Sequence, residues 1–337
     1  MPKILVTGGL GYIGSHTCVV LQQAGYEVVV VDNLLNSKPE VALQIEKITQ
    51  QPLAVEFVDI CDAHALKGFF EQHSDLDGII HFAALKAVGE SVDQPELYFN
   101  NNVGGILQLL EQSPKQLPIV FSSSCTVYGQ SKVLPLQEDF PFQKAESPYG
   151  STKQMCEDIL RFTAPKQQRK VIALRYFNPI GAHPTAHIGE LPQGVPQNLV
   201  PYMTQTAAGK RPKLNVFGAT YNTPDGSCIR DYIHVMDVAQ AHVKAIERQL
   251  SKRQVEPYEA FNIGTGKGHS VLELIHLFEK ATGVAVPHAI AAPRVGDVVA
   301  AYADTQYAET TLNWKAQYSI EQALQDAWAW EKAAPNE

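Results

Sequence analysis

The stretch TGGLGYIG, residues 7–14, decides the fold of the first half of this chain. It directly follows an apolar segment that we expect to be a strand, Lys3–Thr7, and it opens an expected helix. Glycines let a backbone turn tightly and approach a pyrophosphate at the positive end of a helix. Counting from Gly8 gives GxxGxxG and counting from Gly9 gives GxGxxG, so the sequence leaves the register open.

An acidic residue ends the next expected strand, Glu27–Asp32. Asp32 follows Gly14 at close to the roughly 20-residue spacing at which an acid binds the ribose diol of a dinucleotide. A carboxylate there repels a 2′-phosphate, which favours NAD over NADP. Strand, glycines, helix, strand and acid together predict an NAD site.

Working outward, short β-branched runs alternate with helical patterns, which is typical of a doubly wound parallel sheet. We therefore predict an α/β Rossmann-type domain, residues 1–177, with helices beginning near Gly11, Pro39, Ala63, Glu96 and Pro148. The expected strands are Lys3–Thr7, Glu27–Asp32, Ala54–Val58, Gly78–Phe82, Pro118–Ser122 and Lys170–Arg175.

The second half, residues 178–337, is richer in Pro, Gly and Asn and carries few strand patterns. A chain of 337 residues exceeds the usual size of a single core, so we expect a second, smaller mixed α/β lobe. No flexible linker separates the two halves, and chain crossings between the lobes are therefore expected. Helical patterns cover Leu199–Ala208, Val235–Arg248, Ser270–Ala281 and Ile320–Trp330.

Composition excludes several classes of protein. The formal net charge of −8 argues against a general nucleic-acid binder. Five cysteines without CxxC spacing argue against a zinc site or disulfide framework and fit the reducing cytoplasm. We find neither a signal peptide nor an apolar run long enough to cross a bilayer, and we expect no metal site and no membrane partner.

A second motif, SPYGSTK at residues 147–153, reads as the start of a helix. Tyr149 and Lys153 then lie on one face at i and i+4. Ionising a tyrosine near pH 7 requires about 4 kcal/mol, and one cation at roughly 5 Å supplies about 3 kcal/mol at an effective dielectric of ~20. A second nearby cation would complete the shift. Taken alone, the same pattern also fits an ordinary exposed helix pair.

Polar residues follow other strands of the expected sheet. After the fifth strand, Ser124 and Thr126 are both candidates for a hydroxyl beside Tyr149, whereas Cys125 has no local histidine and is not expected to be a nucleophile. His81 is expected to be structural. Asp59 fits a helix cap and a cofactor ligand about equally well.

Together these segments resemble the extended short-chain dehydrogenase/reductase family, and within it the enzymes that interconvert UDP-galactose and UDP-glucose. The resemblance runs from Met1 nearly to the C-terminus, and its most specific stretches are Ser147–Lys153, Arg175–Pro184 and Arg230–Asp237. It implies a homodimer that epimerises the sugar at C4 through a transient 4-keto intermediate on tightly bound NAD.

The resemblance also assigns residues, with Tyr149, Ser124 and Lys153 as the catalytic set. It implies a cofactor site made of Gly8, Gly11, Tyr12, Ile13, Gly14, Asp32, Asn33, Leu34, Leu35, Asn36, Ser37, Asp59, Ile60, Phe82, Ala83, Ala84, Leu85, Lys86, Asn101, Ser124, Tyr149, Lys153 and Phe177. It implies a UDP-sugar site made of Lys86, Ser124, Tyr149, Asn178, Asn198, Leu199, Asn215, Phe217, Arg230, Tyr232, Arg294, Asp297 and Ala301.

Two features bear on the reaction and its substrate. Related dehydratases and decarboxylases place an acid after the hydroxyl of the fifth strand, where this chain has Cys125 and Thr126, which argues against elimination. Relatives confined to simple hexoses carry tyrosine where this chain has Ala301, so the resemblance implies room for an N-acetyl group. The alternative is that the loop around Ala301 packs differently and fills this space, so that no N-acetyl group fits. A plain dehydrogenase and a silent NAD-binding relative remain as alternatives.

Overall fold

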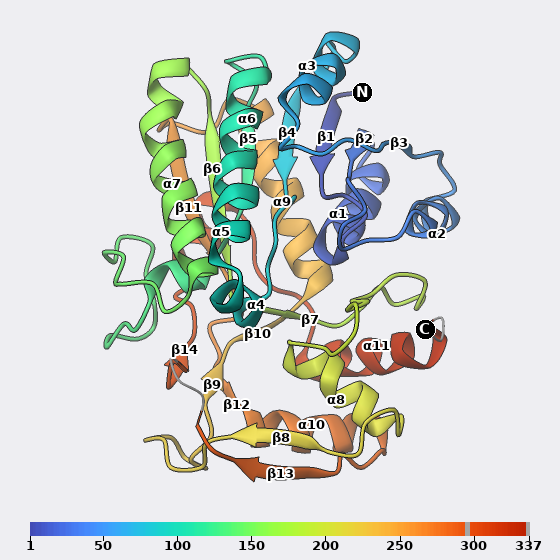
Figure 1. Ribbon diagram of the computed structural model, residues 1–337, viewed down its shortest axis with the longest axis vertical. Helices are drawn as coiled ribbons and strands as arrows, with labels where there is room; N and C mark the ends of the chain where they lie inside the picture. The colour runs from blue at the N-terminus through green and yellow to red at the C-terminus, as the bar shows by residue number, and fades with distance from the viewer. Residues whose placement is uncertain (294–296, 335–337) are drawn as a thin grey trace.

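A seven-stranded parallel sheet forms the centre of the larger lobe in the computed structural model, which describes residues 1–293 and 297–334 (Figure 1). The strand order is β11-β6-β5-β4-β1-β2-β3, and the order reverses direction between β1 and β4. This is the doubly wound arrangement expected from the sequence. The strands are β1 (Lys3–Thr7), β2 (Glu27–Val31), β3 (Ala54–Glu56), β4 (Gly78–His81), β5 (Ile119–Ser124), β6 (Val171–Tyr176) and β11 (Tyr258–Ile263).

Helices cover both faces of this sheet, because alternate residues of each strand point to opposite sides. In β1, Ile4 and Val6 join the core under one helical layer, and Leu5 joins the core under the other. The first layer is α1 (Tyr12–Gln23), α2 (Glu40–Thr49) and α9 (Val235–Leu250). The second layer is α3 (Ala63–Gln72), α6 (Gly104–Gln112) and α7 (Pro148–Gln167).

The seventh strand, β11, is absent from the sequence prediction of six strands, which is corrected here. It pairs with β6 along its whole length. Its polar residues Glu259 and Asn262 obscure the strand pattern, and their hydrogen-bond partners lie outside the strand. Arg248 Nε donates to a Glu259 carboxylate oxygen at 2.7 Å, and the Tyr128 hydroxyl donates to Asn262 Oδ1 at 2.6 Å.

Two segments from the second half of the chain return to the larger lobe. Helix α9 packs on α1 and on strands of the sheet, and β11 forms a sheet edge (Figure 1). The division at residues 177 and 178 stays a prediction, since these segments lie beyond it in sequence but within the larger lobe in space.

The smaller lobe packs three helices against short paired strands around its own apolar core, which includes Met203, Leu274 and Phe278. Its helices are α8 (Leu199–Ala207), α10 (Val271–Thr282) and α11 (Ile320–Ala333). Its strand pairs are β7 (Asn178–Ile180) with β10 (Tyr232–His234), β8 (Leu214–Phe217) with β13 (His288–Ala291), and β9 (Ile229–Arg230) with both β12 (His269–Ser270) and β14 (Ala300–Ala301).

Short helical turns complete the fold. They are α4 (Val88–Asp93), α5 (Pro95–Tyr98), a π-helical turn (Phe99–Val103), a 3₁₀ turn (Cys125–Tyr128) and a second π-helical turn (Ala308–Leu312). Within residues 1–293 and 297–334, each helix is too short or too polar to traverse a lipid bilayer.

Candidate active site

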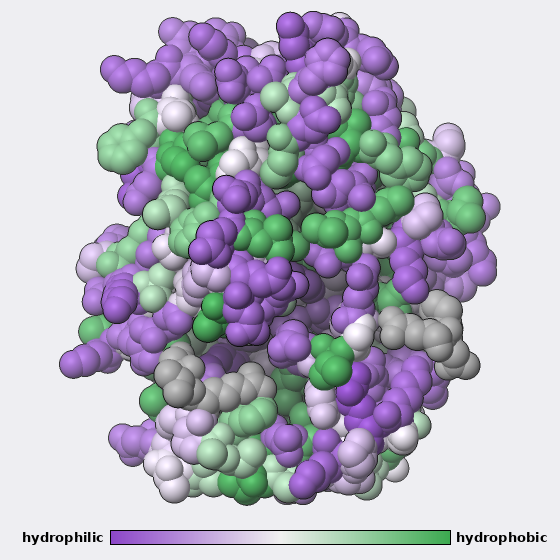
Figure 2. All heavy atoms as spheres, in the orientation of Figure 1, coloured by the Kyte–Doolittle hydropathy of each residue, from purple (hydrophilic) through white to green (hydrophobic). Residues whose placement is uncertain are grey.

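One cavity of about 1820 Å³ runs from the glycine turn after β1 to strand β14, and residues of both lobes line it. The surface is hollowed between the upper and lower lobes in Figure 2. Of the predicted cofactor and substrate residues that the structure describes, only Leu34 and Asp59 do not line this cavity. Arg294 lies outside the described residues. The cavity therefore gathers the predicted site, while the role of each residue stays a prediction.

The glycine turn closes tightly at two positions. Gly8 has φ +68°, and a Cβ there would lie 2.7 Å from the amide nitrogen of Ala83. A Cβ on Gly14 would lie 2.3 Å from the Gly8 carbonyl oxygen. Gly8, Gly11 and Gly14 line the cavity, whereas a Cβ on Gly9 would meet the side chain of Val30. The Gly8–Gly11–Gly14 register therefore faces the cavity.

This geometry fits a dinucleotide. Helix α1 has no side-chain cap at its N-cap residue Gly11 and no acid in its first turn, so its first amides suit a pyrophosphate. Asp32, just past the end of β2, is nearly buried and lines the same cavity. Its carboxylate accepts from the Leu10 amide at 3.0 Å, the Leu34 amide at 2.9 Å and the Ser37 hydroxyl at 2.7 Å. These bonds fix its orientation and leave lone pairs for a ribose diol.

Helix α7 begins where the sequence predicts and carries the candidate base. Ser147 accepts a capping bond from the Gly150 amide at 3.1 Å, and Pro148 occupies the first turn. Lys153 is buried, and its Nζ lies 5.8 Å from the centre of the Tyr149 ring. The ammonium donates to the Ser122 carbonyl at 2.8 Å. Tyr149 and Lys153 thus share one face, as their spacing predicts.

The electrostatic expectation for this pair is wrong in one respect, because it left out burial. Burial raises the pKa of Tyr149 to about 12, although a hydrogen bond with Ser124 acts in the opposite direction. Burial lowers the pKa of Lys153 to about 8. Desolvation disfavours the charged form of both groups. The lysine therefore does not nearly suffice to ionise the phenol, and a further cation has more to supply than the sequence indicates.

Of the two hydroxyl candidates after β5, Ser124 is the one whose side chain acts on Tyr149, by lowering the pKa of the phenol. Its Oγ also accepts from the Thr126 amide at 3.2 Å and so caps the 3₁₀ turn. Thr126 also lines the cavity, and its buried Oγ1 has no hydrogen-bond partner. Burial raises the pKa of Cys125 to about 12, which agrees with its predicted inertness.

Two other polar residues, His81 and Asp59, have defined places. His81 is buried, and its Nδ1 lies 2.7 Å from Thr7 Oγ1. Burial lowers the pKa of His81 to about 3. The side chain is therefore neutral and structural, as predicted. Asp59 does not cap α3, whose cap is Asp62. It accepts instead from the Cys61 amide at 2.8 Å and from Asn33 Nδ2 at 3.1 Å, beside the cavity.

Asn101 stands in a π-helical turn rather than at a helix start, and such turns are frequent at functional sites. It lines the cavity, and its amide donates to Asn102 Oδ1 at 3.0 Å. Asn102 in turn is bonded to both the amide and the carbonyl of Leu85. This contact ties the helix to the loop after β4.

At the far end of the cavity lie the predicted UDP residues. The buried Oδ1 of Asn178 has no hydrogen-bond partner, so an acceptor is left for a ligand. Arg230 lies 3.9 Å from Asp297, and its Nη1 donates to the Ile229 carbonyl. The N-terminus of α8 also faces the cavity through Leu199, and its N-cap residue Asn198 makes no capping bond. A guanidinium and a helix N-terminus both suit a diphosphate.

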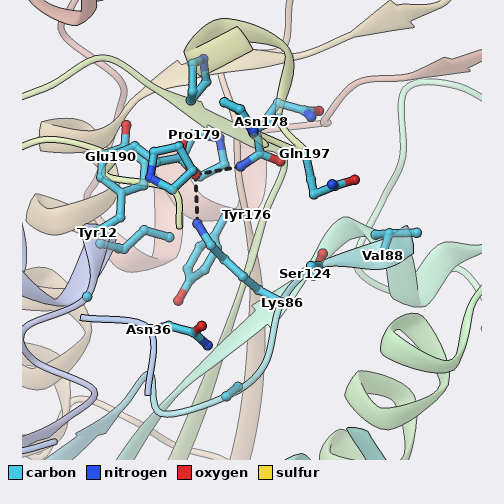
Figure 3. Close-up of a pocket in the computed structure, with 18 of the residues that line it drawn as sticks. Tyr12, Asn36, Lys86, Val88, Ser124, Tyr176, Asn178, Pro179, Glu190 and Gln197 are labelled. Atoms are coloured by element: carbon cyan, nitrogen blue, oxygen red, sulfur yellow. Dashed lines mark hydrogen bonds and ion pairs between the residues drawn. The ribbon is translucent and has the colours of Figure 1, made fainter. Parts of the chain in front are cut away.

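Glu190 is a cavity residue that the sequence analysis missed. Its carboxylate accepts from Lys86 Nζ at 2.8 Å and from Asn198 Nδ2 at 2.7 Å (Figure 3). It lies in the loop between β7 and α8, which has no periodic pattern, and only folding brings it to Lys86. We find no sequence signal that would have singled it out.

Comparisons with known proteins agree with this geometry. The sequence profile described as the NAD dependent epimerase/dehydratase family matches residues 4–264. The chain belongs to this family. Its cofactor is accordingly NAD, for which the glycine turn and Asp32 are suited.

Members of the family match the whole chain. A UDP-glucose 4-epimerase of Dictyostelium discoideum is 47% identical over 337 residues, which cover 99% of this chain and 97% of that protein. One from Bacillus subtilis is 47% identical over 336 residues, covering 99% and 98%. The UDP-glucose 4-epimerase from Stenotrophomonas maltophila, solved with NAD and formylated UDP-arabinopyranose, has a TM-score of 0.94 and 45% identity, covering 99% and 98%. That from Bifidobacterium longum, solved with NAD+ and UDP, has a TM-score of 0.94 and 42% identity, covering 99% of both chains.

Proposed function

We propose that this protein catalyses the reversible C4 epimerisation of UDP-galactose and UDP-glucose through a transient 4-keto sugar on tightly bound NAD. The observation that carries the proposal is the single cavity in which Tyr149, Ser124 and Lys153 lie between the glycine turn and the Arg230 end. Full-length relatives with the same architecture bear the name UDP-glucose 4-epimerase. The resemblance in the sequence led to the same reaction.

The chain's own residues divide the work. Tyr149 removes the proton from the C4 hydroxyl, directly or through Ser124, whose side chain lowers the pKa of the phenol. Lys153 is held by the Ser122 carbonyl and places its charge behind the phenol. Asn178, Arg230 and the N-terminus of α8 hold the UDP moiety, so that the sugar can turn over while the nucleotide stays bound.

When bound, NAD+ would supply a hydride acceptor and a positive charge to this cavity. Because burial raises the pKa of Tyr149, a positive charge in the cavity would favour ionisation of the phenol. After the oxidation step the proton on Tyr149 is the more stable form, which favours its return to the sugar oxygen. Tyr149 therefore acts in turn as base and acid.

Rival reactions in the same family are less well supported. Elimination of water next to the keto group calls for an acid after the fifth-strand hydroxyl, and this position holds Cys125 and Thr126. A plain dehydrogenase would release the keto sugar and accumulate NADH, whereas an epimerase accumulates neither. A silent relative would turn over nothing.

Incubation with UDP-galactose, followed by chromatography of the sugar nucleotides and absorbance at the NADH band, tests the proposal. We expect UDP-glucose to form up to equilibrium without net NADH. A released keto sugar, an eliminated product or no turnover would contradict it.

We further propose that N-acetylated UDP-hexoses are substrates, because Ala301 leaves room beside the sugar. Ala301 lies opposite Arg230 in the pairing of β14 with β9, and it lines the cavity. Its small side chain packs with Val127 and Phe177, among others. Turnover of UDP-GalNAc to UDP-GlcNAc is expected, and no turnover would defeat this extension.

We propose a homodimer formed through the α6 and α7 surface. Leu107, Met155 and Phe162 are exposed apolar residues of these helices, and Phe162 is 76% exposed. Hydrophobic atoms gather over α6 and α7 (Figure 2). Phe162→Glu is expected to shift sedimentation toward monomer, while Phe57→Glu, at an exposed phenylalanine away from these helices, is not. A monomeric wild type would contradict the assignment.

We also place the protein in the cytoplasm. All five cysteines are unpaired, which suits a reducing compartment. Detection in a fractionated cell tests this, and a periplasmic or secreted location would overturn it.

A further inference from the structure

Glu190 is an acidic residue in the cavity that we propose to bind anionic ligands. Glu190 lines the same cavity as the predicted UDP residues, and its side chain is 10% exposed. An unpaired carboxylate there would repel a diphosphate and would itself be costly to bury. The structure pairs it instead, through one oxygen, with Lys86 and Asn198.

The two partners come from different lobes. Lys86 stands in the loop after β4, in the larger lobe, and its ammonium also lies 5.6 Å from the centre of the Tyr12 ring. Asn198 is the N-cap residue of α8, in the smaller lobe, and its side chain is turned to Glu190 rather than to the helix amides. Figure 3 shows Lys86 pointing across the cavity to Glu190. The carboxylate therefore bridges the lobes at the ligand site.

The backbone that carries Glu190 is fixed in place. Trp330 Nε1 of α11 donates to the Glu190 carbonyl at 2.9 Å. A Cβ on the preceding residue, Gly189, would lie 2.5 Å from the Trp330 ring, so the chain lies flat on the indole. Gly189 also pairs with Ala182 in an isolated bridge. Glu190 is thus presented from a rigid support, as a positioning residue must be.

We propose that Glu190 is a positioning residue for the reaction, holding Lys86 and Asn198 in the orientations in which they meet the UDP-sugar and its cofactor. This inference rests on the proposed function, because the ligand roles of Lys86 and Asn198 come from it. Both side chains are exposed, Lys86 to 54%, so each loses conformational freedom on binding unless it is already held. One oxygen of Glu190, Oε1, holds both Lys86 and Asn198 and so reduces the conformational entropy that they lose on binding.

Simple electrostatics makes the opposite prediction, which allows a sharp test. Removing a negative charge beside an anionic ligand should tighten binding if charge alone matters. Removing a positioning acceptor should weaken it. We therefore expect Glu190→Ala to raise KM for UDP-galactose by about five- to fifty-fold, with a much smaller change in kcat. The reason is that Lys86 and Asn198 are no longer held in place before the substrate binds.

Glu190→Gln separates charge from geometry. Its amide oxygen still accepts hydrogen bonds from Lys86 and Asn198, so we expect a KM within about three-fold of wild type. A double-mutant cycle of Glu190→Ala with Asn198→Ala should be non-additive, since the second change removes a partner that the first has already released. Additive effects would mean that Glu190 does not act through Asn198.

Glu331 offers a matched control, because it is a similarly buried acid that pairs with Lys210 at 2.8 Å and lies outside the main cavity. Glu331→Gln is expected to leave KM unchanged. Thermal melting of each variant, with its NAD content after purification, separates misfolding from a binding defect.

Calorimetric titration with UDP keeps the two proposals distinguishable. If the wild type binds UDP but does not interconvert the sugars, the epimerase proposal fails, while the ratio of UDP dissociation constants between Glu190→Ala and wild type still tests the positioning role. A folded Glu190→Ala variant with unchanged or tighter UDP binding and unchanged or lower KM would overturn the inference.

Discussion

In the proposed reaction, the phenol of Tyr149 loses its proton in a place where burial opposes ionisation. The pKa of Tyr149 is raised to about 12, and the pKa of Lys153 is lowered to about 8, by the same desolvation. Ser124 acts in the opposite direction and lowers the pKa of Tyr149, and the nearby Lys153 carries a positive charge when protonated. In the proposed reaction, the oxidised cofactor would add a further positive charge and so favour proton removal.

Tyr149→Phe removes the proton acceptor and little else. We expect kcat to fall by about 10²- to 10⁴-fold, the usual size of a general base contribution. The UDP dissociation constant, measured by calorimetry, should change less than about three-fold, since Tyr149 lies at the sugar and not at the nucleotide. Tyr307→Phe, at an exposed tyrosine, is the control. Near-normal turnover in Tyr149→Phe would refute its assignment as base.

Ala301→Tyr tests the specificity proposal at the same scale. The larger side chain is expected to fill the space beside Arg230, opposite which Ala301 lies in the pairing of β14 with β9. Turnover of UDP-GalNAc should fall at least about ten-fold relative to UDP-galactose, because a bulky group in a filled pocket clashes. Parallel kinetics with the two sugars measure this. An equal loss for both would show that Ala301 does not discriminate between them.

Among the elements, α7 is fastened to the sheet by a buried ion pair. The Arg175 guanidinium of β6 donates to both Glu157 oxygens of α7, the closest contact being 2.7 Å. Ser123 of β5 and Tyr258 of β11 also donate to this carboxylate. Since Glu157 lies one turn from Lys153, the network fixes the helix that carries the catalytic pair.

Glu157→Gln leaves Arg175 without its counter-ion. Breaking a buried pair in this way costs about 3–5 kcal/mol. We expect a loss of that size in the free energy of unfolding from denaturant titration, at constant NAD. Asp158→Asn, at the neighbouring exposed acid, should stay within about 0.5 kcal/mol. A loss below about 1 kcal/mol in Glu157→Gln would contradict the role given to the network.

Most helices and strands of the larger lobe can be predicted from the sequence, because each of them has a local residue pattern. The start of α7 follows from Ser147 and Pro148, and the first six strands follow from short β-branched runs separated by helical patterns. β11 escapes prediction because polar residues interrupt its apolar pattern, and Asn262 is satisfied by Tyr128, which is distant in sequence. Glu190 escapes prediction because its partner Lys86 is distant in sequence. The pKa of Tyr149 depends on burial, which cannot be read from a local sequence pattern.

Across the whole molecule, several histidines are buried in neutral form. Burial lowers the pKa of His16, His81 and His242 to about 3. Their pKa in the unfolded chain is about 6.5, so the unfolded state binds more protons between these values. Stability is therefore fully present above about pH 6.5 and is lost as the pH falls toward 3.

We accordingly expect the melting temperature to fall steeply below pH 6.5. At pH 5 each such histidine contributes a loss of about 2 kcal/mol. His242→Gln should show a shallower decline between pH 6.5 and 5 than wild type, because one proton-binding group is removed. His64→Gln, at an exposed histidine, should keep the wild-type slope. Identical slopes for His242→Gln and wild type would contradict this explanation.

The two lobes enclose one cavity in which the glycine turn, the catalytic helix α7 and the Arg230 end meet. This arrangement lets a sugar be oxidised and reduced at one carbon without leaving the protein. The central claim is that C4 gives up its hydrogen as a hydride and receives the same hydrogen on its other face.

UDP-galactose labelled with deuterium at C4 tests this most directly. After equilibration with the enzyme in ordinary water, the UDP-glucose product is isolated and its C4 position is read by mass spectrometry and NMR. We expect the deuterium to be retained at C4, because the transferred hydrogen does not exchange with solvent. Loss of the label to water would contradict it, since that would mean that C4 had been deprotonated rather than oxidised.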